Sequence, residues 1–437
     1  MKDRLFALIA AGCLALCLCG CSVFANDTAE WLTPPALAGE ISLIADAVRQ
    51  SAGGDYTFKY PSRGEYRSAV IQNDLDGDGV PEAFALYAKT ENDETTMVID
   101  MISETENTWR SVAKQKIVAG GVDKVAFSDL DGDGLKEILV GWEIYGTSEM
   151  QLGVYSFEEN TLIQRMLQRY TCFVCCDLDE DGAEEIFLIR QNTAEQTATA
   201  ALYELNESGV AELYSCELDR TAKITSDPIV APLSSGKAAV YIDEIKGAGA
   251  ITEVLFIEKN RLVNPLFNAE SGETTATLRS ASLPVQDING DGVLEIPIQE
   301  NVPSVAQADV NEKLYLTKWC SYNGEILTAQ LTAMMNTTDG YYYILPAKLS
   351  GQIAVLKDTE EHLREIYRYD AENERAGELL LSFKTVPASK YDSEKFERGE
   401  YRLLTRDDVS VFLCKEGPSN PDGFKIADVK KAFKIIE

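Results

Sequence analysis

The sequence predicts a mainly β protein: a β-propeller of about five to six blades, followed by a small C-terminal α+β domain. Three observations support this prediction. One nine-residue pattern rich in Asp and Gly occurs four times, at residues 74–82, 129–137, 177–185 and 287–295. Short apolar runs flank each copy, as expected for buried strands. The first three copies begin at 74, 129 and 177, hence 55 and 48 residues apart, a period typical of propeller blades and similar repeats.

The apolar runs place each copy of the pattern between two strands. They are short and rich in β-branched and aromatic residues, which favours strands over helices. The runs before the loops are 69–71, 125–127, 173–174 and 283–285, and those after the loops are 83–87, 138–142, 186–189 and 296–298. Each Asp-rich segment is therefore predicted to be a strand-to-strand connection.

The loops carry the side chains of a metal site. Carboxylates or an amide stand at positions 1, 3, 5 and 9 with Gly at position 6, an arrangement that wraps oxygen ligands around a hard cation such as Ca²⁺. Mg²⁺ fits less well because it prefers six rigid ligands and retains its waters. With the carbonyl at position 7, the predicted ligands are Asp74, Asp76, Asp78, Val80 and Glu82; Asp129, Asp131, Asp133, Leu135 and Glu137; Asp177, Asp179, Asp181, Ala183 and Glu185; and Asp287, Asn289, Asp291, Val293 and Glu295.

The residues after the loops exclude the EF-hand. An EF-hand loop continues to a bidentate Glu at position 12 and then into a helix. Position 12 is apolar in all four copies, where it is Ala85, Val140, Leu188 and Ile298. The calcium loops are therefore predicted to belong to a β protein.

A fifth unit has the same frame without the metal ligands. Asp177 and Asp287 are 110 residues apart, twice the repeat of 55, so a copy is expected near residue 232. The chain there reads as a strand at 229–233, a turn at 234–236 and a strand at 237–242. Ser234 and Ser235 replace the ligands, so this turn is predicted to bind no ion and to close through hydroxyl-to-backbone hydrogen bonds.

At this point the residues resemble a known family. The pattern D-x-[DN]-x-D-G-x-x-E between two short strands is similar to the FG-GAP and VCBS-type repeats of integrin α-chain heads and bacterial surface proteins. The resemblance covers residues 60–330 and implies propeller blades with calcium between strands. The metal-free unit and the five recognisable units depart from the usual six or seven blades, which leaves the closure of the ring open.

The bound calcium is predicted to be structural. Four side chains and one carbonyl use most of the coordination sphere of each ion, and loops in different blades cannot converge as a two-metal centre. About four structural Ca²⁺ ions are therefore expected. Removing them should lower stability because the clustered carboxylates would then repel one another.

The N-terminus predicts export and lipid anchoring. Lys2 and Arg4 precede an apolar stretch from Leu5 to Leu18, which is too short for a comfortable membrane span, and a Leu-Cys-Gly-Cys sequence ends at Cys21. This resembles a bacterial lipobox, which implies a signal peptide at 1–20, acylated Cys21 and a tether at 21–35 on the extracytoplasmic face of the cell membrane. The alternative is an ordinary secretory signal with incidental cysteines.

Composition restricts the partners and suggests two domains. The chain has 437 residues and a formal net charge of −31, which argues against nucleic acid or an anionic membrane surface as partner. At this length two domains are expected, a propeller with a preceding helix at 36–335 and an α+β domain at 336–437. The predicted partners are the membrane, through the lipid, and an extracellular protein or carbohydrate ligand.

Two regions lie outside the repeats. Leu37, Ile41, Ile44, Ala45 and Val48 recur at helical spacing and predict one amphipathic helix before the first blade. After residue 335, strands are expected at 341–345, 353–356, 379–383 and 409–413, with a closing helix at 427–436. The alternative is that 344–356, which resembles 229–242, forms a sixth metal-free blade.

The cysteines outside the export segment favour packing over metal binding. Cys172, Cys175 and Cys176 lack a second Cys pair and a nearby histidine that would complete a zinc site. In a strand, Cys172 and Cys176 share one face and Cys175 lies on the other. All three are expected to be small buried side chains. The alternative of a disulfide stays open for Cys172, Cys175, Cys176, Cys216, Cys320 and Cys414.

The sequence contains little that predicts catalysis. The single histidine, His362, lies in a charged segment expected to be an exposed turn, and the common nucleotide, protease and hydrolase motifs are absent. The first functional hypothesis is a surface binding module. The second is a hydrolase or lyase acting on polysaccharide, for which Trp109, Trp142 and Trp319 are either sugar platforms or core residues.

Overall fold

The computed structural model describes residues 39–91, 94–105, 108–147, 149–279, 283–303, 305, 315–391, 399–419 and 422–436. The predicted signal peptide, Cys21 and the tether at 21–35 lie outside this set. The chain divides into two compact units. The first comprises residues up to Lys59 with Ser68–Asn73 and Val80–Ile117, and the second comprises Tyr60–Arg67, Asp74–Gly79 and Val118–Glu437.

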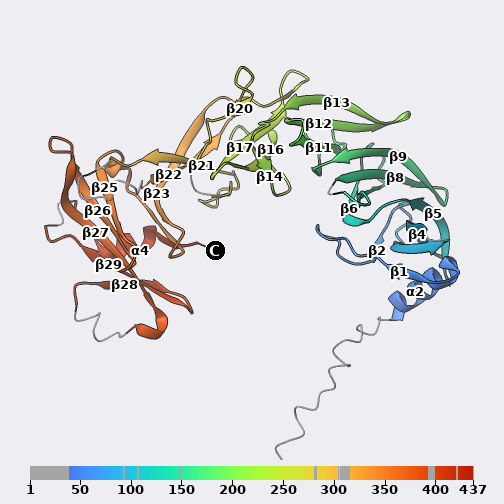
Figure 1. Ribbon diagram of the computed structural model, residues 1–437, viewed down its shortest axis with the longest axis horizontal. Helices are drawn as coiled ribbons and strands as arrows, with labels where there is room; N and C mark the ends of the chain where they lie inside the picture. The colour runs from blue at the N-terminus through green and yellow to red at the C-terminus, as the bar shows by residue number, and fades with distance from the viewer. Residues whose placement is uncertain are drawn as a thin grey trace, which may run out of the picture. The chain divides into compact units, whose positions relative to one another are not determined.

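The protein is mainly β, as predicted, and is built from several antiparallel sheets (Figure 1). In the two four-stranded sheets the strands pair in the order in which they follow one another along the chain, whereas β30 joins a sheet whose other strands lie far earlier in the sequence. The pairings among the described strands give separate sheets and show no closed barrel or propeller. The propeller of five to six blades therefore stays a prediction.

The first unit is one sheet with the predicted helix against it. Helix α2 (Gly39–Ala52) buries Ile44 and Val48 completely on a core formed with the sheet. Ile41, expected on the same face, is 36% exposed, so the buried face is narrower than predicted. The five strands are β1 (Tyr56–Phe58), β2 (Val70–Asn73), β3 (Glu82–Glu91), β4 (Glu94–Thr105) and β5 (Thr108–Ile117).

The second unit begins with two four-stranded sheets of the same topology. In each, the Asp-rich loop connects the first strand to the second, which confirms its predicted place between strands. The first sheet is β6 (Gly121–Ser128), β7 (Glu137–Glu143), β8 (Met150–Glu158) and β9 (Thr161–Tyr170). The second is β10 (Cys172–Cys176), β11 (Glu185–Asn192), β12 (Thr197–Asn206) and β13 (Gly209–Glu217).

The third sheet of this unit contains the predicted metal-free copy. Strands β15 and β16 pair as a hairpin around residues 233–237, which confirms the strand, turn and strand expected near residue 232. The sheet comprises β14 (Lys223–Ile224), β15 (Ile229–Pro232), β16 (Ala238–Lys246), β17 (Gly249–Ile257) and β18 (Leu262–Val263). A two-stranded ribbon follows, β19 (Phe267–Asn268) and β20 (Glu273–Thr274).

Two five-stranded sheets complete the described chain. The fourth Asp-rich loop precedes the first of them, which is β21 (Ile296–Asn301), β22 (Tyr315–Tyr322), β23 (Leu327–Asn336), β24 (Tyr341–Ile344) and β30 (Phe433–Ile435). The other is β25 (Ile353–Asp358), β26 (Leu363–Asp370), β27 (Arg375–Pro387), β28 (Arg402–Arg406) and β29 (Ser410–Glu416). Helix α4 (Ile426–Ala432) and the 3₁₀ turns η1 (Ala347–Leu349) and η2 (Ala388–Lys390) lie between strands.

The C-terminal region differs from the prediction in two ways. A boundary between 335 and 336 would cut the β23–β24 hairpin, whose strands are hydrogen-bonded from Ala333 to Ile344. The closing helix ends at Ala432, because residues 433–435 form β30 and pair with β24. The alternative, a sixth metal-free blade at 344–356, lacks its hairpin, since β24 and β25 lie in different sheets.

Consecutive sheets of the second unit share hydrophobic cores. Residues from neighbouring sheets occur together in four buried clusters, which join β6–β9 to β10–β13, that sheet to β14–β18, the next to β21–β23, and this one to β25–β29. Strand β10 contributes to two of them: Cys172 and Cys176 face one neighbour and Cys175 the other, as the strand period predicts. The six described cysteines are unpaired thiols.

No helix within the described ranges is long and apolar enough to cross a membrane.

Candidate functional site

The first Asp of each loop organises the loop backbone. Its carboxylate accepts the N–H of the Gly at position 6, and in the four loops the acceptors are Asp74, Asp129, Asp177 and Asp287, with nitrogen–oxygen distances of 3.1, 3.0, 3.1 and 2.8 Å. The conformation requires glycine at several positions. Gly77, at position 4 of the first loop, has φ +74°, and an added Cβ would lie 2.8 Å from Leu135 Cδ2.

The Glu at position 9 closes the second, third and fourth loops. Glu137, Glu185 and Glu295 are buried, and one oxygen of each accepts the N–H at position 2, at 3.1, 2.9 and 3.1 Å respectively. Glu137 Oε1 also accepts a hydrogen bond from Ser156 Oγ at 3.1 Å. Glu82, the corresponding residue of the first loop, begins β3 and is 4% exposed.

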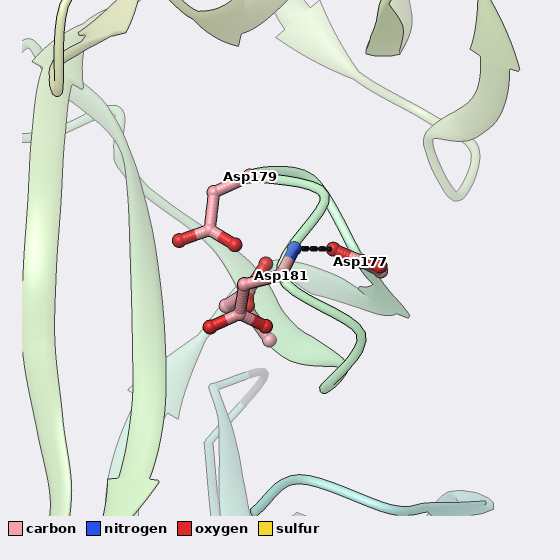
Figure 2. Close-up of side chains that lie close together, drawn as sticks. Asp177, Asp179 and Asp181 are labelled. Carbon is pink, nitrogen blue, oxygen red and sulfur yellow. Dashed lines mark hydrogen bonds between the residues drawn. The ribbon is translucent and has the colours of Figure 1, made fainter. Parts of the chain in front are cut away.

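Three of the loops gather their carboxylates as a cation site requires. Ligand oxygens lie within 4.8 Å of one another in three groups, namely Asp74, Asp76 and Asp78; Asp129, Asp131 and Glu137; and Asp177, Asp179, Asp181 and Glu185. Figure 2 shows three side chains of the third loop, with the backbone N–H of Asp181 donating to Asp177 at 3.1 Å. Asp129 Oδ1 and Asp179 Oδ1 are buried without a hydrogen-bond partner. One cation bound in each of these two loops would satisfy its orphaned oxygen, so the residues fit metal ions.

The electrostatics of these loops also fit a cation. Burial, together with the neighbouring loop carboxylates, raises the pKa of Glu137 and of Glu185 to about 7. The same causes raise the pKa of Asp131 and of Asp179 above the ordinary value for an Asp. A divalent cation among these groups would favour their ionised forms and reverse the shifts.

The fourth loop differs because Asn289 replaces an Asp. Its amide nitrogen donates to Asp291 Oδ2 and to Glu295 Oε1, both at 3.0 Å. The backbone N–H of Gly292 and its neighbours lower the pKa of Asp287. The amide of Asn289 thus links two carboxylates that would otherwise repel each other. Of the four loops, the fourth does not occur among the compact acidic groups.

The predicted carbonyl ligands stand where the loop turns into the second strand. The N–H groups of Leu135, Ala183 and Val293 donate to the Asp at position 5, at 2.7, 2.9 and 2.9 Å. Val80 is 43% exposed. Metal coordination by their carbonyls stays a prediction.

The metal-free turn closes through its main chain. Leu233 N–H donates to Lys237 O and Gly236 N–H donates to Leu233 O, both at 2.8 Å. The predicted closure through the hydroxyls of Ser234 and Ser235 is therefore wrong. The backbone of a short turn satisfies itself, and Ser234 instead donates its N–H to Tyr322 O at 2.9 Å in a neighbouring sheet.

Neighbouring loops touch one another. Glu184 N–H donates to Asp129 O at 3.0 Å, and Ser128 Oγ donates to Glu184 Oε2 at 2.6 Å, so the third loop is fastened to the second. Glu180 Oε1 accepts the N–H of Ala238 at 3.1 Å, which fastens the third loop to the metal-free hairpin. Glu180 has φ +63° at the position where the other loops have Gly.

A cavity lies at the opposite ends of the same strands. Strands β6 and β10 run toward their Asp-rich loops, whereas the cavity is lined from the starts of β6, β8, β10 and β12 and the ends of β9 and β11. We call it the strand-end pocket. Its volume is about 720 Å³, and polar side chains predominate in its lining, including Arg63, Asp123, Arg169, Arg190 and Thr197.

A partly buried ionic network forms the floor of the strand-end pocket. Arg63 donates to both oxygens of Asp123, at 2.6 and 2.7 Å, and also to Asp227. Tyr170 Oη donates to Asp123 as well. Lys124 Nζ contacts Asp227 at 3.0 Å. Burial and the Asp123 charge raise the pKa of Tyr170, so its phenol stays neutral.

Buried carboxylates also occur in the sheet that lacks the metal loop. Glu244 on β16 is 1% exposed, and a side-chain hydrogen bond with Glu253 favours its protonated form. Burial and the neighbouring charge of Glu253 raise the pKa of Glu244 to about 10. Glu253 is better satisfied, since it accepts hydrogen bonds from Thr274 and Asn264 at 2.7 and 2.8 Å.

The aromatic and histidine hypotheses have clear outcomes. Trp109, Trp142 and Trp319 are at most 7% exposed and therefore belong to the core, not to a sugar platform. His362 lies in the turn between β25 and β26 with its side chain 48% exposed, as expected. Its Nδ1 lies 2.6 Å from Asp339 Oδ1, a contact that the sequence did not predict.

The strand-end pocket was missed by sequence reasoning. Its residues come from segments far apart in the chain, and Arg63 lies in a connection without a motif. The carboxylates in the metal-free sheet had a usable signal, because Glu244 and Glu253 lie within mainly apolar strands. The Asp-rich loops were recognisable because their pattern occurs four times in the sequence.

Comparison with known proteins assigns no family. No protein-family model matches the chain, and no curated protein matches it. Similar solved structures include the rhamnogalacturonan lyase YesW, at 12% identity and a TM-score of 0.30, covering 73% of this chain and 71% of that one.

Two further structures are similarly distant. The exotype rhamnogalacturonan lyase YesX has 11% identity and a TM-score of 0.31, with coverage of 82% and 90%. A Bacillus licheniformis rhamnogalacturonan lyase has 14% identity and a TM-score of 0.30, with coverage of 83% and 72%. These TM-scores are too low to carry an argument about this chain, and the resemblance to FG-GAP and VCBS repeats stays a prediction.

Proposed function

We propose that this protein is a lipid-anchored, calcium-stabilised binding module that presents a ligand site on the extracytoplasmic side of the bacterial cell membrane. The observation that supports it is the separation of two polar sites on the same sheets. The acidic loops occupy one end of the strands and the strand-end pocket occupies the other. Calcium at the loops would therefore stabilise the sheets without touching a ligand in the pocket.

The proposed ions are Ca²⁺, about four per chain, held by the four Asp-rich loops. The support is the compact grouping of carboxylates in three loops and the two orphaned buried oxygens of Asp129 and Asp179. Calorimetric titration of chelator-treated full-length protein is expected to give three equivalents of similar affinity and a fourth that binds more weakly. The absence of binding heat would refute the assignment.

The proposed anchor is a diacylated Cys21. Two acyl chains suffice for stable attachment where one is marginal, and a protein of net charge −31 has no electrostatic attraction to an anionic membrane. Changing Cys21 to Ser is expected to release a calcium-loaded protein or leave it uncleaved. If the cleaved variant still sediments with washed membranes, a protein partner and not a lipid holds it there.

A second candidate function is a hydrolase or lyase acting on an extracellular polysaccharide. It is favoured by the carboxylates among the pocket residues, Asp123, Glu149 and Glu195. Asp123 is already engaged by Arg63 and Tyr170, which leaves the rim residues Glu149 and Glu195 as the groups for acid–base chemistry.

The two candidates differ in product formation. Incubation of the calcium-loaded protein with a panel of polysaccharides, followed by assays for new reducing ends and for ultraviolet-absorbing unsaturated sugars, tests for catalysis. The binding-module proposal expects retention of a polysaccharide without either product. Product that disappears in Glu149→Gln or Glu195→Gln would establish the enzyme instead.

A further inference from the structure

We infer that the strand-end pocket is the ligand site of this protein and that its ligand is an uncharged oligosaccharide. The inference rests on the proposed binding function and adds the site and the chemical class of the ligand. It follows from four properties of the pocket: a rigid floor, a fixed wall, accessible hydrogen-bonding groups and balanced charge.

The floor is fixed before any ligand arrives. The segment that carries Arg63 runs alongside β6, with Ser62 N–H donating to Val122 O at 3.0 Å and Arg63 N–H donating to Asp123 O at 2.9 Å. Lys124 Nζ donates to Phe173 O at 2.6 Å, which joins β6 to β10. Because these polar groups satisfy one another, they hold the floor in one conformation and shape the cavity above it.

One wall is fixed by side-chain hydrogen bonds at the end of β11. Gln191 donates its N–H to Thr171 Oγ1 and its Nε2–H to Ala222 O, both at 2.8 Å. Asn192 Oδ1 accepts the N–H groups of Ala194 and Glu195 at 3.1 and 3.2 Å, which fixes the turn into β12. A preorganised wall lowers the entropy cost of binding a flexible chain of sugars.

The pocket presents polar groups that the protein itself does not use. Within the described residues, the hydroxyls of Thr197, Thr199 and Ser226 make no hydrogen bond to the protein, although all three line the pocket. Arg169 and Arg190 form only solvent-exposed ion pairs, with Glu149 at 3.1 Å and with Glu212 at 3.8 Å. Exposed pairs of this kind are weak, so the guanidinium groups can turn toward ligand hydroxyls.

The charges of the lining exclude other ligand classes. Three arginines, Arg63, Arg169 and Arg190, are matched by three carboxylates, Asp123, Glu149 and Glu195. A site for an anion would carry a cationic excess, and the pocket has none. Met150 and Ile224 are among the few apolar residues of the lining, too few for a lipid or an apolar peptide. A chain rich in neutral hydroxyl groups matches this combination.

The size of the cavity suits a short oligosaccharide. Its volume of about 720 Å³ lies within the ordinary range for sites that enclose most of a small ligand. Its opening at the strand ends admits a longer chain whose remaining units extend into solvent. An oligosaccharide of a few units is therefore the expected probe.

The test begins with the calcium-loaded, full-length protein in detergent. A glycan array carrying neutral and uronate-containing oligosaccharides identifies the best neutral probe, and calorimetric titration measures its affinity. Thr197→Val and Arg190→Gln, which remove hydrogen-bonding groups from the pocket, are each expected to weaken binding about tenfold. Matched controls outside the pocket, Thr328→Val and Arg110→Gln, are expected to leave affinity unchanged.

The outcomes separate this inference from the function on which it rests. Binding of a neutral glycan that the pocket variants leave unchanged, in proteins with wild-type melting temperatures, overturns the site while the binding function stands. Preference for uronate-containing glycans that the pocket variants abolish overturns the uncharged ligand but not the site. Failure of every glycan to bind overturns the inference and the carbohydrate side of the proposed function together.

Discussion

The sheet with the third Asp-rich loop and the adjacent metal-free sheet join a pair of antiparallel strands by different connections. Between β10 and β11, an eight-residue loop brings three Asp carboxylates close to that of Glu185, the first residue of β11. Between β15 and β16, a short turn closes through two main-chain hydrogen bonds. The strand pairing is alike in both, so the hairpin frame does not depend on the ligands. The acidic loop therefore adds a cation requirement to a hairpin that can form without one.

The position of buried charge changes together with the loop. The third loop concentrates its carboxylates at the strand junction, where a cation can neutralise them. The metal-free sheet instead buries Glu244 and Glu253 within β16 and β17. There a bound proton, and not a cation, must neutralise the buried charge. Calcium removal and substitutions at Glu244, Asn289 and Glu180 test this comparison.

Removal of calcium is expected to have the largest effect. Without a cation, the carboxylates of three loops must be protonated or repel one another, so the melting temperature should fall by on the order of 10 °C. Differential scanning calorimetry with excess chelator, and again after calcium is restored, measures the change. Magnesium in place of calcium is the control and should restore less. An unchanged melting temperature in chelator would mean that something other than calcium holds the loops.

Glu244→Gln is expected to stabilise the protein by on the order of 2 kcal/mol near pH 8. The pKa of Glu244 is about 10 in the folded protein against 4.5 in the unfolded chain. The unfolded state therefore loses its proton first, and stability from this group falls as pH rises from about 4.5 toward 10. The amide cannot ionise, so the variant should show a flatter decline in urea unfolding experiments.

The surroundings of Glu244 make this effect specific. Glu253 on β17 and Asp219 raise its pKa, whereas Lys246 on β16 opposes them, and burial is the largest cause. Glu258→Gln, at an exposed glutamate beyond β17, is the matched control and should leave the pH dependence unchanged. A wild-type pH profile in Glu244→Gln would show that Glu244 is ionised in the folded protein.

Asn289→Asp is expected to strengthen the weakest calcium site about tenfold. The substitution replaces an amide that donates to Asp291 and Glu295 with a fourth carboxylate, as in the other loops. In calorimetric titration, the fourth equivalent should merge with the first three. Asn323→Asp, in the turn between β22 and β23, adds the same charge outside the loop as a control. Unchanged affinity would mean that the amide oxygen already serves as a full ligand.

Substitutions of Glu180 are expected to have the smallest effects. Glu180→Ala loses the hydrogen bond to Ala238 but keeps a side chain at φ +63°, so the free energy of unfolding should fall by about 1 kcal/mol. Glu180→Gly loses the same hydrogen bond, but glycine adopts this positive φ without strain. Its free energy of unfolding should therefore remain within about 0.5 kcal/mol of the wild type. Urea unfolding at saturating calcium measures both. Equal losses in the two variants would contradict the role of backbone strain.

Repetition made the loops and their strands predictable from the sequence. The alternation of polar and apolar residues around Asp129 and Asp177 is local, and local patterns survive in the fold. The metal-free hairpin followed from spacing alone, although Ser234 and Ser235 suggested the wrong bonds because main-chain hydrogen bonds leave no side-chain signature.

The remaining errors concern contacts between distant segments. Residues 433–435 continue a helical pattern, but β24 offers an unpaired edge, and strand pairing at that edge overrides the local preference. The strand-end pocket brings Arg63, Asp123 and Arg190 together from separate connections, and no local pattern marks such a meeting. The site that repeats was visible in the sequence, and the site that does not repeat required the structure.

The placement of the two sites at opposite strand ends has a consequence for engineering. The turn from Asn192 to Thr197 borders the pocket, and the acidic loop of the same sheet lies at the far end of β11. Residues inserted into that turn would extend the pocket rim without reaching the ion. Randomising residues 193–196 would therefore give a library from which variants with a new ligand preference can be selected. Calcium-dependent stability, measured for each variant, would show that the scaffold is still folded.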